Sequence, residues 1–270
     1  MKGVPKGSLQ GLLVLERALE GRVRGVRWGV GHRAVETGES TVVIVLQGQC
    51  DKGLASLYHE EIITVSGQQR RLVVTNGIPS HTYHNYTGTG RRQNPNEACR
   101  TPVFMVLPLN PSKGGYRESS LGPVGIATSG AFFYNHKDSS NRVAATTEAQ
   151  TFDSCMGHAD PQCRYHYHKA PVCIPSQCSV IGYLRDGVSV YGLCSLEGRT
   201  LRSCYRLRTG RSGQSVTDYY YQAGPDCQLD EANGFVFPDG RYGYIFSENY
   251  PFIMPGYRGT QLAQICSVAQ

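Results

Sequence analysis

The sequence lacks any apolar run long enough to cross a membrane. No stretch reaches the roughly 18 residues that a transmembrane helix needs, so we expect no membrane span. The net charge is also small beyond the N-terminus. Residues 1–34 carry seven Lys or Arg and two Glu of a chain with net charge +6, and the remainder is nearly neutral. Because nucleic-acid binding needs a basic stripe on the folded part, we expect no nucleic-acid partner.

Familiar catalytic and metal-binding motifs are missing as well. The chain contains no G-x-S-x-G and no H-E-x-x-H. It has no C-x-x-C pair, since its nearest cysteines, Cys173 and Cys178, are five positions apart. These absences argue against a serine hydrolase elbow, a helical zinc protease site and a zinc ribbon.

A secretory signal peptide of normal form is also missing. The apolar run GLLVL at residues 11–15 is short and is followed at once by Glu16 and Arg17. We therefore predict that residues 1–37 are a poorly structured leader or a misassigned N-terminus, with the secretory signal missing from this version of the chain. Residues 38–270 are predicted to form one domain.

The chain does contain ten cysteines. An even number of cysteines scattered over some 220 residues predicts a disulfide framework made in an oxidising compartment, and hence an extracellular protein. The sequence does not determine the pairing. The disulfide candidates are Cys50, Cys99, Cys155, Cys163, Cys173, Cys178, Cys194, Cys204, Cys227 and Cys266.

The composition favours strands and turns. The chain has 32 Gly, 14 Pro and 17 Tyr. β-branched runs at residues 41–50, 101–115 and 124–135 predict strands, and EIITVSG followed by RRLVVTNG predicts a hairpin. Short strands recur beyond Cys155. We predict a mainly β fold: a single disulfide-stabilised domain, β-sandwich-like or irregular, with few short helices.

Two glycines mark turns between these late strands. Gly187 follows Asp186 and Gly234 follows Asn233, and such pairs are typical of turns whose glycine has a positive φ. We therefore predict a positive φ at both glycines.

Two histidines in the stretch RYHYH are the first candidates for chemistry. Side chains alternate along a strand, so His166 and His168 would share one face, with Tyr165 and Tyr167 on the other. Residues two apart in a strand have Cα atoms about 6.5–7 Å apart. Two imidazoles at that spacing can ligate one ion at about 2.0–2.1 Å.

Neighbouring stretches offer further ligands. His158 precedes the pair across a turn, His81 follows a tight turn at Asn76-Gly77, and Asp160 could ligate or orient an imidazole. Imidazole-rich sites suit Zn or Cu. The alternative is that these imidazoles only hydrogen-bond to backbone carbonyls within a sheet. The predicted metal-binding set is His81, His158, His166, His168 and Asp160.

A glycosylation sequon lies beside one more histidine. Asn85-Tyr86-Thr87 predicts a glycan at Asn85. A glycan there would crowd a metal site that used His84, so His84 is left out of the ligand set.

Several ordered blocks resemble a known family. The chain is similar to members of the YHYH-domain family, named for the tetrapeptide found here at residues 165–168. Met156 departs from the family's CGGH element, where a glycine is usual, and Lys169-Ala170 replace a Gly-Leu pair. The resemblance implies that the histidine-bearing blocks form one compact module of a secreted or envelope protein, and it implies no particular reaction. The blocks run from Asn76 to Gly259 and read TNGIPSH, NPNEACRTPVFMVLPLNP, GPVGIATSGAFFYN, FDSCMGHADPQCRYHYHKAPVC, IGYLRDGVSVYG and LDEANGFVFPDGRYGYIFSENYPFIMPGYRG.

Three functions remain open on these observations. The first is a secreted domain that binds a divalent transition metal through the histidine cluster. The second is a metal-dependent hydrolase or oxidase, with a general base from Asp153, Asp160 or Asp186. The third is a metal-free structural, matrix or carbohydrate-binding module, in which Tyr219 and Tyr221 share a strand face. The sequence favours the first, and a matrix component or a small molecule is the expected partner.

Overall fold

The computed structural model describes residues 56–83, 94–175 and 177–267, together with the course of three strands nearer the N-terminus. These strands pair in the order β2-β1-β3. The boundary at residues 37 and 38 stays a prediction, and Cys50, His84 and Asn85 lie outside the described residues. The three strands are β1 (Gly11–Arg17), β2 (Val23–Gly29) and β3 (Val42–Leu46).

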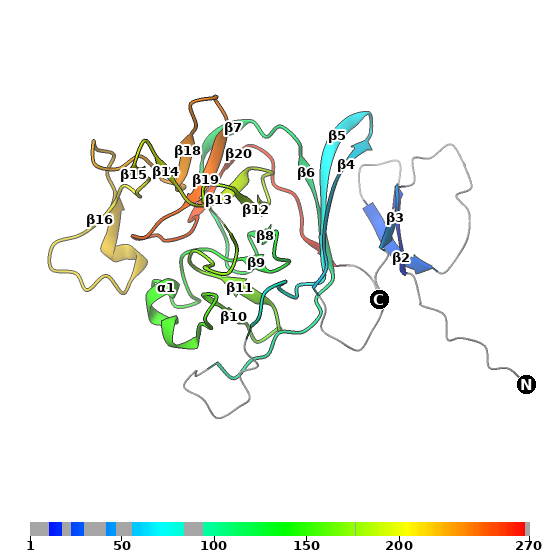
Figure 1. The fold of residues 1–270 in the computed structure, drawn as a ribbon, viewed down its shortest axis with the longest axis horizontal. Coiled ribbons are helices and arrows are strands. Elements are labelled where there is room, and N and C mark those ends of the chain that lie inside the picture. Colours follow the sequence, from blue (N-terminus) through cyan, green and yellow to red (C-terminus); the bar gives the residue numbers. More distant parts are fainter. Residues whose placement is uncertain are drawn as a thin grey trace, which may run out of the picture.

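The described chain is mainly β, as predicted (Figure 1). Among the described residues, helical structure is confined to one α-helix and two 3-10 turns, and no helix has the length and apolar character of a membrane span. These elements are α1 (Ala144–Thr147), η1 (Ala149–Thr151) and η2 (Val216–Asp218).

An eight-stranded mixed sheet forms the centre of the fold. Its order is β10-β11-β9-β8-β12-β13-β19-β18. β11 runs parallel to β9 and β13 parallel to β19, while the other neighbours are antiparallel. Its strands are β8 (Gly125–Ala127), β9 (Phe132–Phe133), β10 (Gly157–Ala159), β11 (Tyr165–Tyr167), β12 (Val180–Leu184), β13 (Ser189–Leu193), β18 (Gly234–Val236) and β19 (Tyr242–Phe246).

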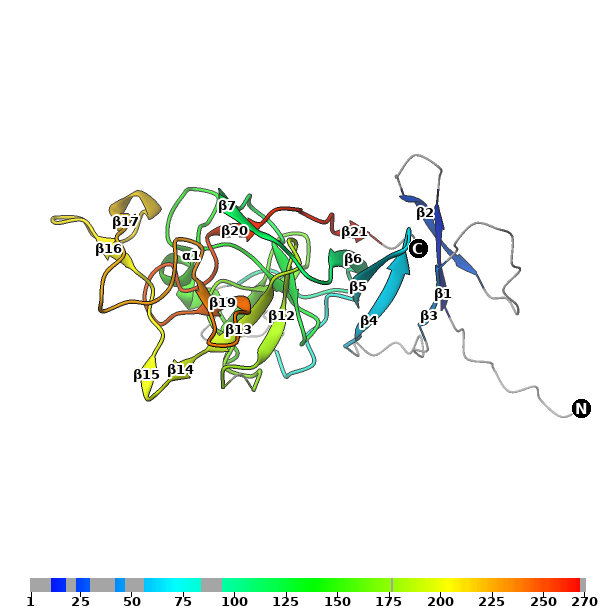
Figure 2. The ribbon, with the colours of Figure 1, turned by 90° about the horizontal axis from the view of Figure 1, so that it is seen from above.

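A four-stranded antiparallel sheet, in the order β21-β6-β5-β4, packs against the first. Its hairpin is confirmed: β4 and β5 are joined by Ser66 and Gly67, which both have positive φ, as a two-residue hairpin turn requires. Figure 2 shows this sheet and the hairpin of β16 (Tyr205–Leu207) and β17 (Tyr219–Tyr221) on opposite sides of the eight-stranded sheet. Its strands are β4 (Tyr58–Val65), β5 (Gln68–Thr75), β6 (Val103–Pro108) and β21 (Cys266–Ser267).

Three two-stranded sheets complete the described strands. The hairpin of β16 and β17 carries the tyrosine run, and Tyr219 stacks on Tyr250 with ring centres 3.8 Å apart. Tyr221 packs edge-on against Tyr205, so both inward tyrosines serve packing. The strands are β7 (Lys113–Glu118) with β20 (Gly256–Gly259), β14 (Ser195–Leu196) with β15 (Arg199–Thr200), and β16 (Tyr205–Leu207) with β17 (Tyr219–Tyr221).

An apolar layer joins the two large sheets. Val73 of β5 and Met105 of β6 meet Phe132 of β9 in one fully buried cluster. Leu72, next to Val73, points to the opposite face of the four-stranded sheet, as strand alternation requires. Face-to-face burial of this kind gives the sandwich-like arrangement that the sequence predicts.

Disulfide bonds stabilise the part of the chain beyond residue 150. Three of the predicted framework's bonds are formed, Cys155–Cys173, Cys178–Cys194 and Cys204–Cys227. Among the described residues, Cys99, Cys163 and Cys266 are unpaired in the structure, so their part in the framework stays a prediction.

The two predicted turn glycines differ. Gly187 has a φ of +83°, as predicted, but the left-handed residue at the second turn is Asn233, with a φ of +58°, and not Gly234. Gly234 is needed instead for space, because a Cβ atom there would overlap the Tyr242 ring. Asparagine tolerates the left-handed region better than most residues, which explains the exchange of roles.

Gly187 gives a direct test of this packing. An added Cβ would lie 2.6 Å from the carbonyl oxygen of Pro108 in a left-handed backbone, so Gly187→Ala should lower the free energy of unfolding by about 2–4 kcal/mol. The matched control is Gly240→Ala, since Gly240 has a φ of +82° with no atom within 4 Å. It should cost only about 1 kcal/mol. Equal losses in urea titrations of the two variants would contradict this account.

Candidate metal centre

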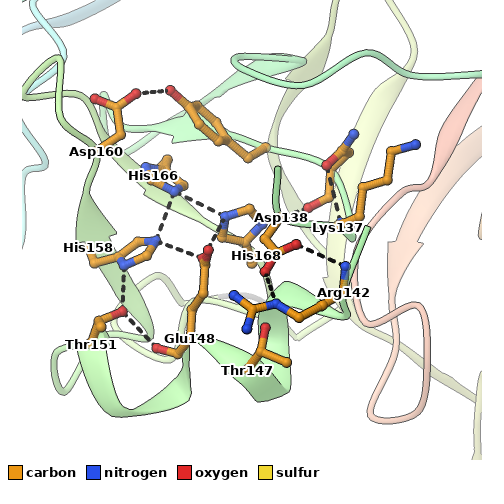
Figure 3. Close-up of polar contacts among 12 residues, drawn as sticks. Lys137, Asp138, Arg142, Thr147, Glu148, Thr151, His158, Asp160, His166 and His168 are labelled. Carbon is orange, nitrogen blue, oxygen red and sulfur yellow. Dashed lines mark hydrogen bonds and ion pairs between the residues drawn. The ribbon is translucent and has the colours of Figure 1, made fainter. Parts of the chain in front are cut away.

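Three buried imidazoles converge at the edge of the eight-stranded sheet. β10 and β11 pair with His158 directly opposite His166, and His168 follows β11 on the same face. The Nε2 atom of His166 lies 2.9 Å from that of His158 and 3.1 Å from that of His168 (Figure 3). All three residues are at most 7% exposed. The predicted sharing of one strand face by His166 and His168 is therefore seen in the structure.

Backbone carbonyls fix the tautomers of two imidazoles. His166 Nδ1 lies 2.9 Å from the carbonyl oxygen of Arg164, and His168 Nδ1 lies 2.6 Å from that of Asn135. A carbonyl oxygen only accepts hydrogen bonds, so each Nδ1 carries the hydrogen and donates it. In the neutral imidazole the Nε2 atom then carries a lone pair.

A threonine fixes the third tautomer. The Thr151 hydroxyl donates to the carbonyl oxygen of Glu148 at 2.7 Å, and its oxygen lies 2.7 Å from His158 Nδ1. Because the hydroxyl already donates its one hydrogen to Glu148, it accepts a hydrogen bond from His158 Nδ1–H. All three Nε2 lone pairs therefore face one another.

Glu148 adds an oxygen to this group. Its Oε2 atom lies 3.4 Å from the Nε2 atoms of both His158 and His168. That oxygen is buried and has no hydrogen-bond partner in the structure. Glu148 directly follows α1, and a glutamate in AATTEAQT carries no sequence signal that would single it out. Sequence reasoning therefore missed it.

The separations are close to those of donor atoms around one four-coordinate metal ion. Four ligand atoms at about 2.0–2.1 Å from a central zinc ion lie about 3.3–3.4 Å from one another. Four of the six distances among the three nitrogens and the carboxylate oxygen are known, and they are 2.9, 3.1, 3.4 and 3.4 Å. To bind a zinc ion, His158 and His166, whose Nε2 atoms are 2.9 Å apart, would need to move only slightly away from each other.

Burial keeps the imidazoles neutral. Desolvation lowers the pKa of His158 to about 3 and that of His168 to about 4, and it holds the pKa of His166 well below its usual value, with the neighbouring imidazoles adding to the effect on His166 and His158. Burial and the nearby Asp138 carboxylate raise the pKa of Glu148 to about 7. At neutral pH the histidines are thus in the state that metals bind.

Asp160 supports the three histidines through Tyr134 and supplies none of the converging ligand atoms. Its Oδ1 accepts from the backbone N–H groups of Gln162 and Arg164, and its Oδ2 accepts from the Tyr134 hydroxyl and the Arg164 guanidinium. The Tyr134 ring stacks on His166 with ring centres 3.7 Å apart. The carboxylate thus holds the ring that orients an imidazole, which was the second of its two expected roles.

His81 does not join the three histidines. Its Nε2 atom is hydrogen-bonded to the hydroxyl of Tyr167, which points to the opposite face of β11 from His166 and His168. His81 also lies near Cys155 and Cys173, but those sulfurs are bonded to each other and offer no thiolate. The expected ligand set is corrected on this point.

The other candidate bases lie away from the histidines. Asp153 accepts from the Tyr165 hydroxyl at 2.7 Å, on the tyrosine face of β11. Asp186 is buried between the Tyr244 hydroxyl and the backbone N–H of Gly259. Both carboxylates serve packing networks.

A cavity of about 430 Å³ with mixed polar and apolar walls opens onto the three histidines. Its walls carry both charges, with Lys137 and Arg164 as cations and Asp138 as an anion beside Glu148. The cations are engaged, since Lys137 pairs with Glu118 and Arg164 with Asp160. The cavity gives an ion a path from solvent to the buried nitrogens.

Comparison with known proteins identifies one similarity. The family model described as "YHYH protein" matches residues 104–259, which hold the three histidines and Glu148. Searches of the curated proteins and of the solved structures found no similar protein.

The lowered histidine pKa values predict acid lability of the metal-free protein. Below pH 6.5 the unfolded chain binds protons at these positions and the folded chain does not, so stability falls as the pH drops from about 6.5 towards 4. Each histidine contributes up to about 1.4 kcal/mol per pH unit, and Glu148, with its raised pKa, offsets one of them between about pH 4.5 and 7.

Urea denaturation in a chelator at several pH values measures this slope. We expect a net loss of about 2–4 kcal/mol per pH unit below pH 6.5, and a shallower slope in His166→Gln. A free energy of unfolding that stays constant between pH 7 and 5 would be incompatible with neutral buried imidazoles.

Proposed function

The chain belongs to the YHYH protein family, and we propose that its histidine cluster binds one divalent transition-metal ion, Zn²⁺ or Cu²⁺. His158, His166 and His168 would supply nitrogen ligands, and Glu148 would supply an oxygen. The proposal rests on one observation: three Nε2 atoms without hydrogens face one another at 2.9 and 3.1 Å in a buried place.

That arrangement is unfavourable without a positive charge at its centre. Lone pairs at 2.9 Å repel each other, and the unpartnered oxygen of Glu148 adds negative charge whenever that carboxyl is ionised. A divalent ion at the centre would bond to all four donor atoms, since each neutral imidazole nitrogen and the carboxylate oxygen is a good ligand for it.

The ligand atoms suit Zn²⁺ or Cu²⁺. Three imidazoles with one carboxylate are borderline ligands that suit Zn²⁺ and Cu²⁺, and the absence of sulfur among them disfavours Cu⁺.

A holding role is better supported than a catalytic one. Catalytic zinc sites keep one position open for water, and here Glu148 occupies the fourth corner. A hydrolase or oxidase reaction would need that carboxylate to move away. The disulfide bonds are typical of an oxidising compartment, so we place the metal-binding protein outside the cell.

Metal titration of matched variants tests the proposal. We expect the wild-type protein, made without a histidine tag, to bind one Zn²⁺ per chain in calorimetry and elemental analysis. His166→Gln should lower the affinity at least about 100-fold and Glu148→Gln about 10–100-fold. His81→Gln is the control, because His81 lies on the other face of β11, and its affinity should be unchanged. Equal affinities of His166→Gln and His81→Gln would refute the proposed site.

The imidazole tautomer gives a second test of the same site. Thr151→Val removes the acceptor of His158 Nδ1–H while keeping the side-chain shape, so the ring is free to present a protonated Nε2. Loss of such an outer partner lowers metal affinity by about 10–100-fold. Thr147→Val, one turn earlier with its hydroxyl bonded to the carbonyl of Val143, should keep the wild-type affinity.

A further inference from the structure

Two unpaired thiols meet beside the turn that joins β10 to β11. Cys99 and Cys163 are both half-buried and take part in none of the three disulfides. The backbone N–H of Cys99 donates to the carbonyl oxygen of Cys163 at 3.0 Å. Their side chains are neighbours as well, since Cys163 contributes to the raised pKa of the Cys99 thiol.

The backbone hydrogen bond limits how far apart the two residues can be. A Cα atom lies about 1.46 Å from its own nitrogen and about 2.4 Å from its own carbonyl oxygen. With 3.0 Å between nitrogen and oxygen, the two Cα atoms cannot be more than about 6.9 Å apart. Disulfides bridge Cα atoms about 4.4–6.8 Å apart, so the bond can form with little backbone movement.

The pair joins two parts of the chain that already touch. Cys163 ends the turn that begins at Asp160, where its N–H donates to the Asp160 carbonyl. On the other side, the side-chain amides of Asn94 and Asn96 both donate to the carbonyl oxygen of Ala159, at 3.0 and 3.3 Å. A bond between the sulfurs would therefore tie the segment at residues 94–101 to the hairpin that carries His158 and His166.

We propose that Cys99 and Cys163 form a fourth disulfide bond in the mature protein. The two thiols lose two protons and two electrons, and one sulfur–sulfur bond forms. The electrons and protons pass to the disulfide of a thiol oxidant, such as oxidised glutathione or an oxidoreductase of an oxidising compartment, which becomes two thiols. The step needs no metal ion, so the proposed disulfide can be tested independently of the proposed metal site.

This bond would be structural. Burial and the contact with Cys163 raise the pKa of the Cys99 thiol to about 11, and a thiol with so little thiolate at neutral pH attacks other disulfides slowly. Once closed, the bond would enclose a long stretch of chain and so remove much freedom from the unfolded state.

Peptide mapping of the full chain tests the proposal. The protein is equilibrated with a mixture of oxidised and reduced glutathione, denatured, alkylated and digested without reduction, and the fragments are identified by mass spectrometry. Alkylation follows denaturation because the native Cys99 thiol would react slowly. We expect the peptides that contain Cys99 and Cys163 to be joined. Recovery of both as alkylated thiols, or of either joined to another cysteine, would overturn the proposal.

Serine variants supply the matched control. Cys99→Ser and Cys163→Ser should each lower the melting temperature of the oxidised protein by about 5–15 °C, and the double variant should lower it no further. In Cys266→Ser, which changes the remaining unpaired cysteine among the described residues, the Cys99–Cys163 link should persist. Additive losses from the two single variants would contradict a shared bond.

Discussion

The arrangement at the sheet edge depends on one constraint, the direction in which three imidazole hydrogens point. Each Nδ1–H donates to a group that can only accept. For His166 and His168 this group is a backbone carbonyl, and for His158 it is the Thr151 hydroxyl, whose own hydrogen is already donated. The Nε2 atoms are therefore left bare and turned inward. Burial then prevents the positive charge that would otherwise relieve their repulsion, because it lowers the pKa of all three rings.

The fold supplies these acceptors from separate elements. The antiparallel register of β10 and β11 sets His158 opposite His166, and the return of the chain through α1 and η1 brings Glu148 and Thr151 over them. The loop after β9 supplies the carbonyl of Asn135, which lies beside β11 because β9 and β11 run parallel. Tyr134 from the same loop stacks on His166 and is held by Asp160. A shift of any of these elements would turn one ring away from the centre.

Part of this arrangement follows from local sequence rules and part does not. The alternation of RYHYH fixes a shared face for His166 and His168 whatever the rest of the fold does, so the sequence alone predicts it. The position of His158 follows once the two strands pair. Glu148 directly follows a four-residue helix with no distinctive pattern, and His81 was misplaced because the direction in which the chain leaves a turn depends on contacts far along the sequence. Disulfide pairing is unpredictable for the same reason, since it depends on which distant segments meet.

X-ray absorption spectroscopy of the zinc-loaded protein tests the central claim most directly, because it reports the atoms around the ion without relying on variants. The account predicts four light ligands at about 2.0–2.1 Å, with the multiple-scattering pattern of three imidazoles and no sulfur. A sulfur shell at about 2.3 Å would place the metal on cysteines, and a shell of oxygens with fewer than two imidazoles would place it on the protein surface. Either result would contradict the proposal that the inward-facing histidines hold the ion.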